Sequence, residues 1–552
     1  MMNETILGYT PDPQFKTSVA YFSMEFAIDQ QLAIYSGGLG FLAGSHLRSA
    51  YELKQNLVGI GILWKYGYYD QLSNDDGTMR VAFNAKEYPF LEDTGIVFDV
   101  PIKDKLVKVK AFLLPPATFG SAPLYLLSTD HPENDDFGKS ISNRLYDADV
   151  KTKIAQSVLL GVGGGLLLEH LGVEPDRYHM NEGHAVPLNF YLYSKLKDIT
   201  AIKKKMVFTT HTPEVAGNEE HHFELLKEMS FFYHLQSHEV KYILGIEGDQ
   251  FNYTLASLKF AGIANGVSKL HGEVANSMWH GNEGICDIIA ITNAQNQHYW
   301  QDPMLKESID DRNGDKFMQR KKEMKVVLFE EVERKTGKKF DPDVLTVVWA
   351  RRFAAYKRAD LLMYDWDRFL QLVGNAERPV QLIWAGKPYP EDEGAKTIFN
   401  RIVERTRGFA NCAVLTGYEL GLSALLKKGS DVWLNNPMMY REASGTSGMT
   451  AAMNGSINLS IPDGWIPEFA KDGINSFVIK IADDHLSSDE TNRRENANLM
   501  ETLSQTVVDL YYDEPEKWSD MAITAAKDVV PAFESGRMAT QYYQELYDRD
   551  LS

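Results

Sequence analysis

The sequence predicts an α/β protein with two open, mostly parallel sheets in two domains. Short β-rich runs alternate with Gly-rich or amphipathic segments along residues 17–330. A second series of apolar runs starts at residue 345, and a helix-compatible segment follows each run, which is typical of repeated βα units. The chain has 552 residues and is 44% apolar, which is enough to fill more than one hydrophobic core.

The order of these elements predicts the domain borders. The β-rich runs of the first series include 18–22, 124–127 and 206–210. The runs of the second series are 345–350, 380–385, 413–416, 431–434, 457–461 and 477–481. A polar stretch of helical pattern at 315–339 separates the two series, so we place the border near 335–343 and expect domains at 1–338 and 339–491. The remainder, 492–552, has a helical pattern only, and we expect it to pack back towards the first domain.

The acidic charge of the chain disfavours some partners. Its formal net charge is −19, so its long-range field repels nucleic acids and anionic membranes. No stretch reaches the roughly 18 to 20 apolar residues that cross a bilayer, and the first residues lack a basic segment followed by an apolar one. We therefore expect a cytoplasmic protein without nucleic-acid or membrane partners. A phosphate-bearing substrate would need a local cluster of cations.

The two cysteines, Cys286 and Cys412, offer neither a disulfide framework nor the spacing of metal ligands. We expect structural thiols and no metal site. In open α/β sheets, ligands bind beyond the carboxyl ends of the strands, and two such domains that face each other form a cleft. Residues that directly follow β-rich runs are therefore the candidates for a site.

Two segments of this kind suit a phosphate group. SGGLG at 36–40 precedes a helix-like stretch, and glycines before a helix start expose backbone N–H groups. A tight turn is the alternative reading of this segment. RRFAAYKR at 351–358 directly follows the run at 345–350, and its cations Arg351, Arg352, Lys357 and Arg358 stand out in an acidic protein. This segment indicates an anion site.

Three further segments suit a sugar. EASGTSGMT at 442–450 follows the run at 431–434, and its small residues let a ligand approach the backbone. A carboxylate in this segment accepts hydrogen bonds from sugar hydroxyls, although an ordinary Ser- and Gly-rich loop is the alternative. NEGH at 181–184 and TTHTP at 209–213 also follow short strands, and each contains a histidine that is either catalytic or structural.

Together these segments resemble a known family. In chain order, the matching segments are SGGLG, NEGHA at 181–185, THT at 210–212, NGVSKLHGEV at 265–274, RRFAAYKR, DVWLNNP at 431–437, EASGTSGM at 442–449 and DGW at 463–465. They are similar to motifs of the short bacterial α-glucan (glycogen) phosphorylases over about residues 20–470. The resemblance implies the GT-B fold, in which two Rossmann-like domains face each other across a catalytic cleft. Because the first motif comes early, we expect no regulatory N-terminal segment of the animal type.

The resemblance also implies roles for individual residues. Those implied to bind phosphate are Gly37, Gly38, Leu39, Gly40, Arg352 and Lys357. Those implied to surround the transferred glucose are His211, Asn293, Tyr356, Glu442, Ala443, Ser444 and Gly445. His211 would present its backbone carbonyl and imidazole to the sugar, and Glu442 would accept a hydrogen bond from the sugar 3-hydroxyl.

The chain departs from the family pattern at three places. The family has a lysine that forms a Schiff base with pyridoxal phosphate, whereas this chain has Thr450, whose hydroxyl forms no imine. Ser45 stands where the family has aspartate. The family's TNGVH is TNAQN at 292–296, so Ala294, Gln295 and Asn296 differ. We therefore expect no covalent pyridoxal phosphate, and a noncovalent one is the only form left open.

Three functions are compatible with these residues. The first is a retaining hexosyltransferase of glycogen or related carbohydrate metabolism that uses a nucleotide sugar, with Arg352 and Lys357 stabilising the leaving diphosphate. Related GT-B enzymes bind the nucleotide ribose with a glutamate at the position of Thr450. A threonine hydroxyl can also donate a hydrogen bond to a ribose hydroxyl, which favours this function. The second is a true α-glucan phosphorylase that holds pyridoxal phosphate noncovalently and uses a sugar phosphate. The third is a noncatalytic glucan-binding or regulatory protein. The acceptor in the first two is a glucan or a small sugar.

Overall fold

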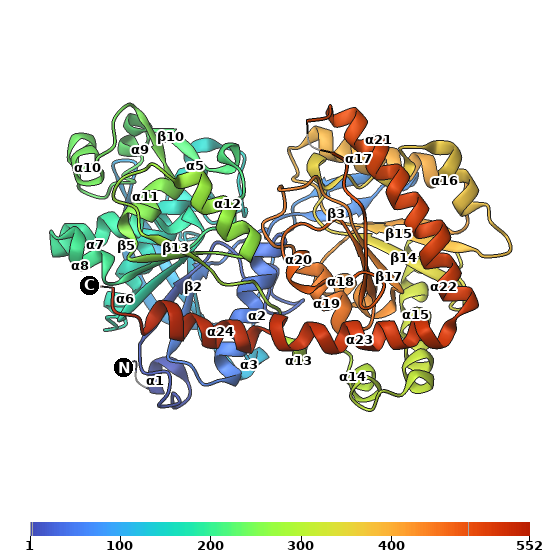
Figure 1. The fold of residues 1–552 in the computed structure, drawn as a ribbon. Coiled ribbons are helices and arrows are strands. Elements are labelled where there is room, and N and C mark those ends of the chain that lie inside the picture. The colour runs from blue at the N-terminus through green and yellow to red at the C-terminus, as the bar shows by residue number, and fades with distance from the viewer. Residues whose placement is uncertain (1, 3, 484, 552) are drawn as a thin grey trace. The chain divides into compact units, whose positions relative to one another are not determined.

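The computed structural model describes residues 2, 4–483 and 485–551. The chain divides into two compact units (Figure 1). Unit 1 consists of the chain up to Tyr69, Phe83–Asn296, and the chain from Ser535 onwards, and unit 2 consists of Asp70–Ala82 and Gln297–Glu534. These borders differ from the expected one near 335–343. Helix α15 (Gly314–Thr336) packs on α18 (Leu420–Gly429) and therefore belongs with the second sheet.

Unit 1 is built on one mixed sheet, which has nine strands within the described residues, in the order β13-β12-β9-β8-β1-β2-β7-β6-β5. The strands are β1 (Val19–Phe22), β2 (Leu57–Ile62), β5 (Glu92–Ile102), β6 (Lys105–Leu114), β7 (Leu124–Ser128), β8 (Arg177–Asn181), β9 (Met206–Thr209), β12 (Ile263–Gly266) and β13 (Asp287–Ala290). Strands β13 to β7 pair in parallel, and β6 is antiparallel to both of its neighbours. The central strands are buried on both faces, which explains their nearly continuous apolar sequence.

Helices cover this sheet. The long ones are α2 (Gly38–Glu52), α5 (Val150–Val158), α6 (Gly164–His170), α7 (Pro187–Leu196), α10 (Ser237–Leu244), α11 (Tyr253–Phe260), α12 (Lys269–Trp279) and α24 (Ser535–Tyr542). The short helices and turns are α1 (Glu4–Leu7), α3 (Pro116–Phe119), α4 (Asp136–Ser140), η1 (Leu159–Gly163), η2 (Gly183–Ala185), α8 (Ile199–Lys203), η3 (Val215–Gly217), α9 (Phe223–Glu228) and η7 (Tyr543–Tyr547). A small antiparallel sheet pairs β10 (Glu220–His222) with β11 (Gln250–Asn252). Helix α24, near the end of the chain, packs on α2 and so lies in unit 1.

Unit 2 is built on a parallel sheet in the order β16-β15-β14-β17-β18-β19. Its strands are β14 (Leu345–Ala350), β15 (Val380–Ala385), β16 (Cys412–Leu415), β17 (Val432–Asn435), β18 (Ile457–Ser460) and β19 (Ser476–Val478). Each one overlaps a predicted run of the second series. The direction of the order reverses at β14 and β17, which is where an open parallel sheet offers a ligand site at its carboxyl edge.

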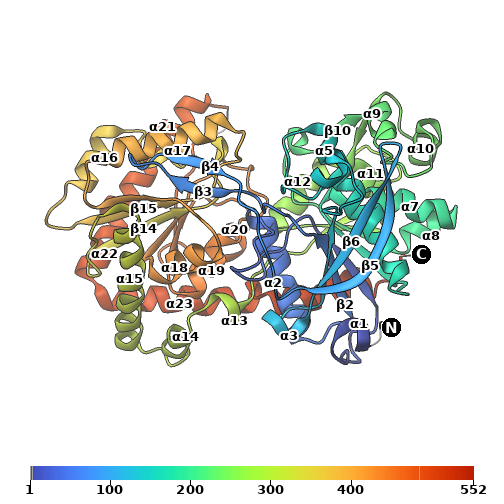
Figure 2. The ribbon, with the colours of Figure 1, turned by 180° about the vertical axis from the view of Figure 1, so that it is seen from behind.

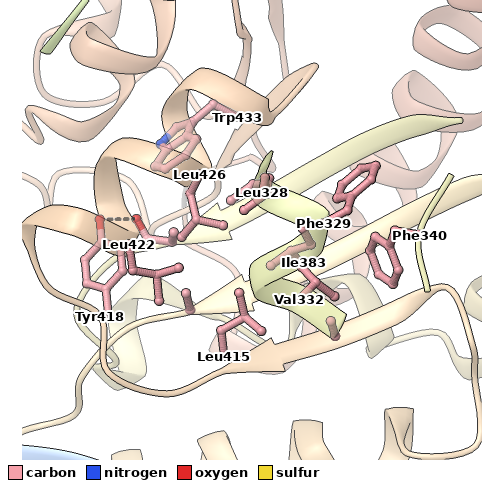
Figure 3. Close-up of a cluster of buried hydrophobic side chains, with 14 of the residues drawn as sticks. Leu328, Phe329, Val332, Phe340, Ile383, Leu415, Tyr418, Leu422, Leu426 and Trp433 are labelled. Atoms are coloured by element: carbon pink, nitrogen blue, oxygen red, sulfur yellow. Dashed lines mark hydrogen bonds between the residues drawn. The ribbon is translucent and has the colours of Figure 1, made fainter. Parts of the chain in front are cut away.

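The helices of unit 2 include most of the C-terminal segment. They are α13 (Gln297–Trp300), α14 (Pro303–Asp310), α15, α16 (Trp366–Val373), α17 (Glu393–Thr406), α18, α19 (Ser447–Met453), α20 (Ile466–Phe469), α21 (Ser488–Glu501), α22 (Val508–Asp513) and α23 (Pro515–Phe533). The unit also contains two short 3-10 turns, η4 (Ala355–Lys357) and η5 (Leu361–Met363), and a π-helical segment, η6 (Thr502–Val507), between α21 and α22. Figure 3 shows how α15 and α18 pack on the sheet through Phe329, Leu426 and Ile383. Burial of this cluster fixes the strands that carry the candidate site.

A hairpin from early in the chain belongs to unit 2. Strands β3 (Asp70–Ser73) and β4 (Met79–Ala82) form a two-stranded sheet that lies against the second domain's elements, as the blue arrows beside α17 show in Figure 2. The Met79 N–H donates to Asn400 Oδ1 at 3.0 Å, and Gln71 Nε2 donates to the Gly386 carbonyl at 2.9 Å. Sequence reasoning misses this hairpin because its partners lie more than 300 residues away along the chain.

The predicted α/β class with parallel sheets is confirmed. Among the described residues, no helix is both long and apolar enough to span a bilayer. Cys286 and Cys412 are both free thiols. Burial raises the pKa of each thiol to about 12, so neither is a thiolate at neutral pH.

Candidate active site

The loop after β14 places two cations at the carboxyl end of a central strand of unit 2. Arg351 follows the strand directly, and its N–H donates to the Ala385 carbonyl at 3.2 Å. Gly386 permits this approach, because a Cβ at this position would lie 1.8 Å from the Arg351 carbonyl oxygen. Lys357 follows in the turn η4. Both side chains are buried, which is unusual for cations unless a partner is present.

Glu442 is the partner of both cations. Lys357 Nζ donates to Glu442 Oε2 at 2.8 Å, and Arg351 Nη1 lies 3.4 Å from the same oxygen. Burial alone would raise the pKa of Glu442, but the positive charges of Lys357 and Arg351 outweigh it and lower the pKa to about 2. Tyr356 is half-buried, with its ring centroid 5.2 Å from Lys357 Nζ. One carboxylate thus faces two cations, and the cluster keeps an excess of positive charge.

Polar atoms without partners belong to the same cluster. Within the described chain, Arg351 Nε and the Ser444 hydroxyl are buried and have no hydrogen-bond partner. Gly445 lies beside them, because a Cβ at this residue would come within 3.5 Å of Arg351 Nη2 and 3.2 Å of Glu442 Cγ. A buried polar group without a partner costs about 1–3 kcal/mol. These atoms therefore fit an anionic or hydroxylated ligand.

The four cations of 351–358 do not act together. Arg358 is buried, and its guanidinium donates to the carbonyls of Asn436 and Pro437 at 3.0 and 2.7 Å. It also pairs with Glu495 at 2.6 Å. Arg358 therefore fixes the loop that follows β17 and serves the fold. The Arg352 side chain is exposed, and its predicted contact with phosphate stays a prediction.

Asp463 holds the loop that carries Glu442. Its carboxylate accepts the N–H groups of Arg441, Glu442 and Gly464 at 3.1, 3.0 and 2.8 Å. Burial raises the pKa of Asp463 to about 6, and the nearby Glu442 charge adds to the rise. Gly464 has φ +62°, and a Cβ there would lie 2.4 Å from the Ser444 carbonyl oxygen. The residues of this fixed loop include the predicted sugar-binding set Ala443, Ser444 and Gly445.

Helix α19 places Thr450 in the interior of unit 2. Its side chain is fully buried, and its hydroxyl donates to the Ser447 carbonyl at 3.0 Å. A hydroxyl forms no imine, so pyridoxal phosphate does not fit as a covalent group at this residue. No cluster of His, Cys, Asp and Glu side chains suited to a metal ion occurs among the residues that the structure describes.

In unit 1, the SGGLG segment is tied to an internal carboxylate. It begins helix α2 with the predicted phosphate-binding residues Gly37, Gly38, Leu39 and Gly40. Glu25 accepts the N–H groups of Ser36 and Gly37 at 2.6 and 3.1 Å and the Tyr146 hydroxyl at 2.8 Å. Gly40 packs on this carboxylate, because a Cβ there would lie 2.7 Å from Glu25 Oε2. The Gly37 N–H already has an acceptor, and phosphate binding by this loop stays a prediction.

His211 lies beyond the end of β9 and contacts the end of β8. Its Nε2 is 2.7 Å from Asn181 Oδ1, and its backbone N–H donates to Glu182 Oε2 at 2.8 Å. Burial lowers the pKa of His211 to about 3, so the imidazole is neutral and donates from Nε2. Asn181 Nδ2 in turn donates to the Ser23 hydroxyl at 3.1 Å. The ends of β9, β8 and β1 therefore carry one connected polar set.

The residues of unit 1 that depart from the family pattern contact one another or α2. The Ser45 hydroxyl donates to Gln295 Oε1 at 2.8 Å, and both side chains are buried. Asn296 Nδ2 donates to the Ser49 hydroxyl at 3.1 Å, which ties the segment to α2 a second time. Ala294 is fully buried in the same segment. Asn293 is also buried there, and its Oδ1 has no hydrogen-bond partner within the described chain.

Comparison with known proteins identifies the family of this chain. The maltodextrin phosphorylase of Thermococcus litoralis is 33% identical over 98% of this chain and 72% of its own length. The chain belongs to the carbohydrate phosphorylase family. The sequence profile of that family, described as carbohydrate phosphorylase, matches residues 249–502. The resemblance predicted from the motifs is therefore confirmed.

Two further relatives of this family member cover nearly all of the chain. The glycogen phosphorylase of Aquifex aeolicus is 31% identical over 97% of this chain and 87% of its own length. An uncharacterized protein of Methanocaldococcus jannaschii is 46% identical over 96% of this chain and 99% of its own length.

Several residues of these clusters are missing from the predicted sites. Arg351 stands within the predicted anion segment, and Asp463 stands within the DGW motif, so a signal for both was present. Glu182 belongs to NEGH, and its φ of +71° marks a strained backbone. Glu25 has no such signal, because only folding brings it to the start of α2.

Proposed function

We propose that this family member is a retaining hexosyltransferase of α-glucan metabolism that works without covalent pyridoxal phosphate and takes a nucleotide sugar as donor. The observation that carries this proposal is the buried cluster of Arg351, Lys357 and Glu442, on loops at the carboxyl edge of the second sheet. The cluster keeps the positive charge that a phosphate group needs. Thr450, by contrast, offers no amine for the family's cofactor.

In this proposal, cations bind the leaving diphosphate. The bond between the sugar C1 and the phosphate oxygen breaks, the electron pair stays on the diphosphate, and Arg351, Arg352 and Lys357 stabilise the negative charge. The acceptor hydroxyl forms the new bond to C1 on the same face and gives its proton to the leaving phosphate oxygen. Glu442, which stays ionised at neutral pH, accepts a hydrogen bond from a sugar hydroxyl.

The roles of unit 1 rest on the sequence resemblance. The predicted GT-B fold assigns His211 and Asn293 to the same sugar, and this assignment is part of the proposal. A neutral His211 suits it, because an uncharged imidazole donates and accepts hydrogen bonds without attracting the donor phosphates. A glucan or a small sugar is the acceptor.

A second candidate is a true α-glucan phosphorylase with noncovalent pyridoxal phosphate and a sugar phosphate donor. The names of two relatives, maltodextrin phosphorylase and glycogen phosphorylase, favour it. When bound, the cofactor would supply a phosphate group for proton transfer, and Arg351 Nε is a buried donor that fits such a group. A noncatalytic glucan-binding protein would not need this donor.

Donor assays distinguish these functions. Purified protein is incubated with maltooligosaccharides and either UDP-glucose, ADP-glucose or glucose 1-phosphate, each with and without added pyridoxal phosphate. We expect chain elongation from a nucleotide sugar that does not depend on pyridoxal phosphate. Elongation from glucose 1-phosphate only in the presence of pyridoxal phosphate would establish the second candidate. If glucans bind but no donor supports transfer, the chain is noncatalytic.

A further inference from the structure

A lysine is buried in unit 2 where the proposed mechanism does not use it. Lys427 lies on α18, and its side chain is 1% exposed. Its Nζ lies 3.7 Å from the centroid of the Trp300 ring, so the amine rests directly on the indole face. Lysines are rarely buried to this degree. Burial lowers the pKa of the Lys427 ammonium well below its ordinary value, so the side chain tolerates an apolar site.

Trp300 is fixed to the helix that carries Thr450. Asn454 Nδ2 donates to the carbonyls of both Trp300 and Thr450 at 2.9 Å. The next residue along the chain, Gln301, donates from Nε2 to the Met453 carbonyl at 2.5 Å. Residues four apart lie on the same face of a helix, so Thr450 and Asn454 share the face that meets Trp300. Helices α13 and α18 both pack on α19, and Figure 1 shows α18 and α19 side by side.

The surroundings of residue 450 are therefore closed by side chains. Thr450 is fully buried, Trp300 and Lys427 are each 1% exposed, and protein interiors are packed nearly as densely as organic crystals. A pyridine ring attached at residue 450 would need space among these closely packed side chains. The Lys427 side chain already covers one face of the Trp300 indole, and Asn454 at the end of α19 holds the Trp300 backbone.

We propose that Lys427, seated on Trp300 beside α19, fills the space that a pyridoxal ring would require next to residue 450, and that the chain thereby excludes the family's cofactor. This inference rests on the proposed cofactor-free function and deepens it. Lys427 on α18 is then a steric barrier to pyridoxal phosphate, in addition to the missing amine at Thr450. Restoring the amine alone is then not enough to bind the cofactor.

Covalent trapping tests the proposal. Wild-type protein, Thr450→Lys, and Thr450→Lys combined with Lys427→Ala are incubated with pyridoxal phosphate, reduced with borohydride and mapped by peptide mass spectrometry. We expect a pyridoxyl adduct on residue 450 of the double variant, at least about tenfold more abundant than in Thr450→Lys, which corresponds to roughly 1.4 kcal/mol. Absorbance in the imine band provides an independent measure of the same adduct.

Two control variants test whether the volume of the Lys427 side chain matters, rather than its charge or a general loss of packing around α19. Thr450→Lys with Lys427→Met removes the amine but keeps the volume, so we expect it to remain unlabelled. Thr450→Lys with Lys321→Ala removes another buried lysine that contacts α19, since Lys321 Nζ donates to the Asn454 carbonyl at 2.9 Å. It should also remain unlabelled. Circular dichroism verifies that each variant is folded.

Two results would overturn the proposal. Equal labelling of Thr450→Lys with and without Lys427→Ala would mean that Lys427 is no barrier. A pyridoxyl adduct on Lys427 of the wild-type protein would mean that this amine anchors the cofactor, and that result needs no variant to fold. Either outcome is distinct from failure of the proposed function, because nucleotide-sugar transfer is measured without pyridoxal phosphate.

Discussion

Replacing Lys357 with alanine gives the sharpest test of the phosphate site. The substitution deletes the 2.8 Å hydrogen bond to Glu442 and leaves that buried carboxylate with Arg351 at 3.4 Å. A hydrogen bond to a charged group contributes about 1.5–3 kcal/mol, and 1.4 kcal/mol corresponds to a tenfold change in affinity. We therefore expect the dissociation constant of a nucleotide-sugar donor to rise by about 10- to 100-fold.

Calorimetric titration of the donor measures this change. Lys339→Ala is the matched control, because Lys339 belongs to the same unit and its side chain is 80% exposed. Its affinity for donor should equal that of the wild type. Thermal unfolding must show that Lys357→Ala is folded at the assay temperature, since Glu442 loses its nearest cation. A folded Lys357→Ala variant with wild-type donor affinity would refute the assignment of this cluster to phosphate.

Three further outcomes follow from the geometry. Gly445→Ala should lower the unfolding free energy by about 1–3 kcal/mol in chemical denaturation, because φ is +74° and the new methyl would meet Glu442. Ser45→Ala should cost about 1–3 kcal/mol in the same assay, because it leaves the buried Gln295 oxygen without its donor, and Ser45→Thr should cost less. The folded pKa of Glu442, about 2, lies below its ordinary 4.5, so its ion pairs stabilise the fold above pH 4.5 and are lost as the pH falls towards 2. Glu442→Gln should flatten that part of the stability curve.

Sequence patterns predict the strands well because local composition determines them. The runs of the second series match β14 to β19 within two or three residues at each end, since buried parallel strands are apolar on both faces. The positions of the functional segments beyond these strands follow from the same rule. The cation segment at 351–358 is an example, because Arg351 and Lys357 both contact Glu442 at the carboxyl end of β14.

The sequence does not reveal which residues contact these functional segments in the folded chain. Arg358 looks like a fourth anion-binding cation, yet it pairs with Glu495 and with carbonyls of the loop after β17. The SGGLG segment looks open to a phosphate, yet Glu25 already accepts from its first N–H groups. Each of these contacts joins residues that only the folded chain brings together.

The residues that depart from the family pattern also have partners that the sequence does not reveal, and these partners affect the proposed function. In the sequence, Ser45 and the residues 294–296 depart from the family pattern together with Thr450. In the structure, one buried hydrogen bond joins Ser45 to Gln295 in unit 1, so these two departures are partners of each other. Lys427, which no motif singles out, lies on the ring of Trp300, and Asn454 bonds the backbone carbonyls of both Trp300 and Thr450 in unit 2. We expect that restoring the family residues at 45 and 294–296 will not let Thr450→Lys form a pyridoxyl adduct, whereas Lys427→Ala will. Borohydride labelling of the two variants separates the explanations.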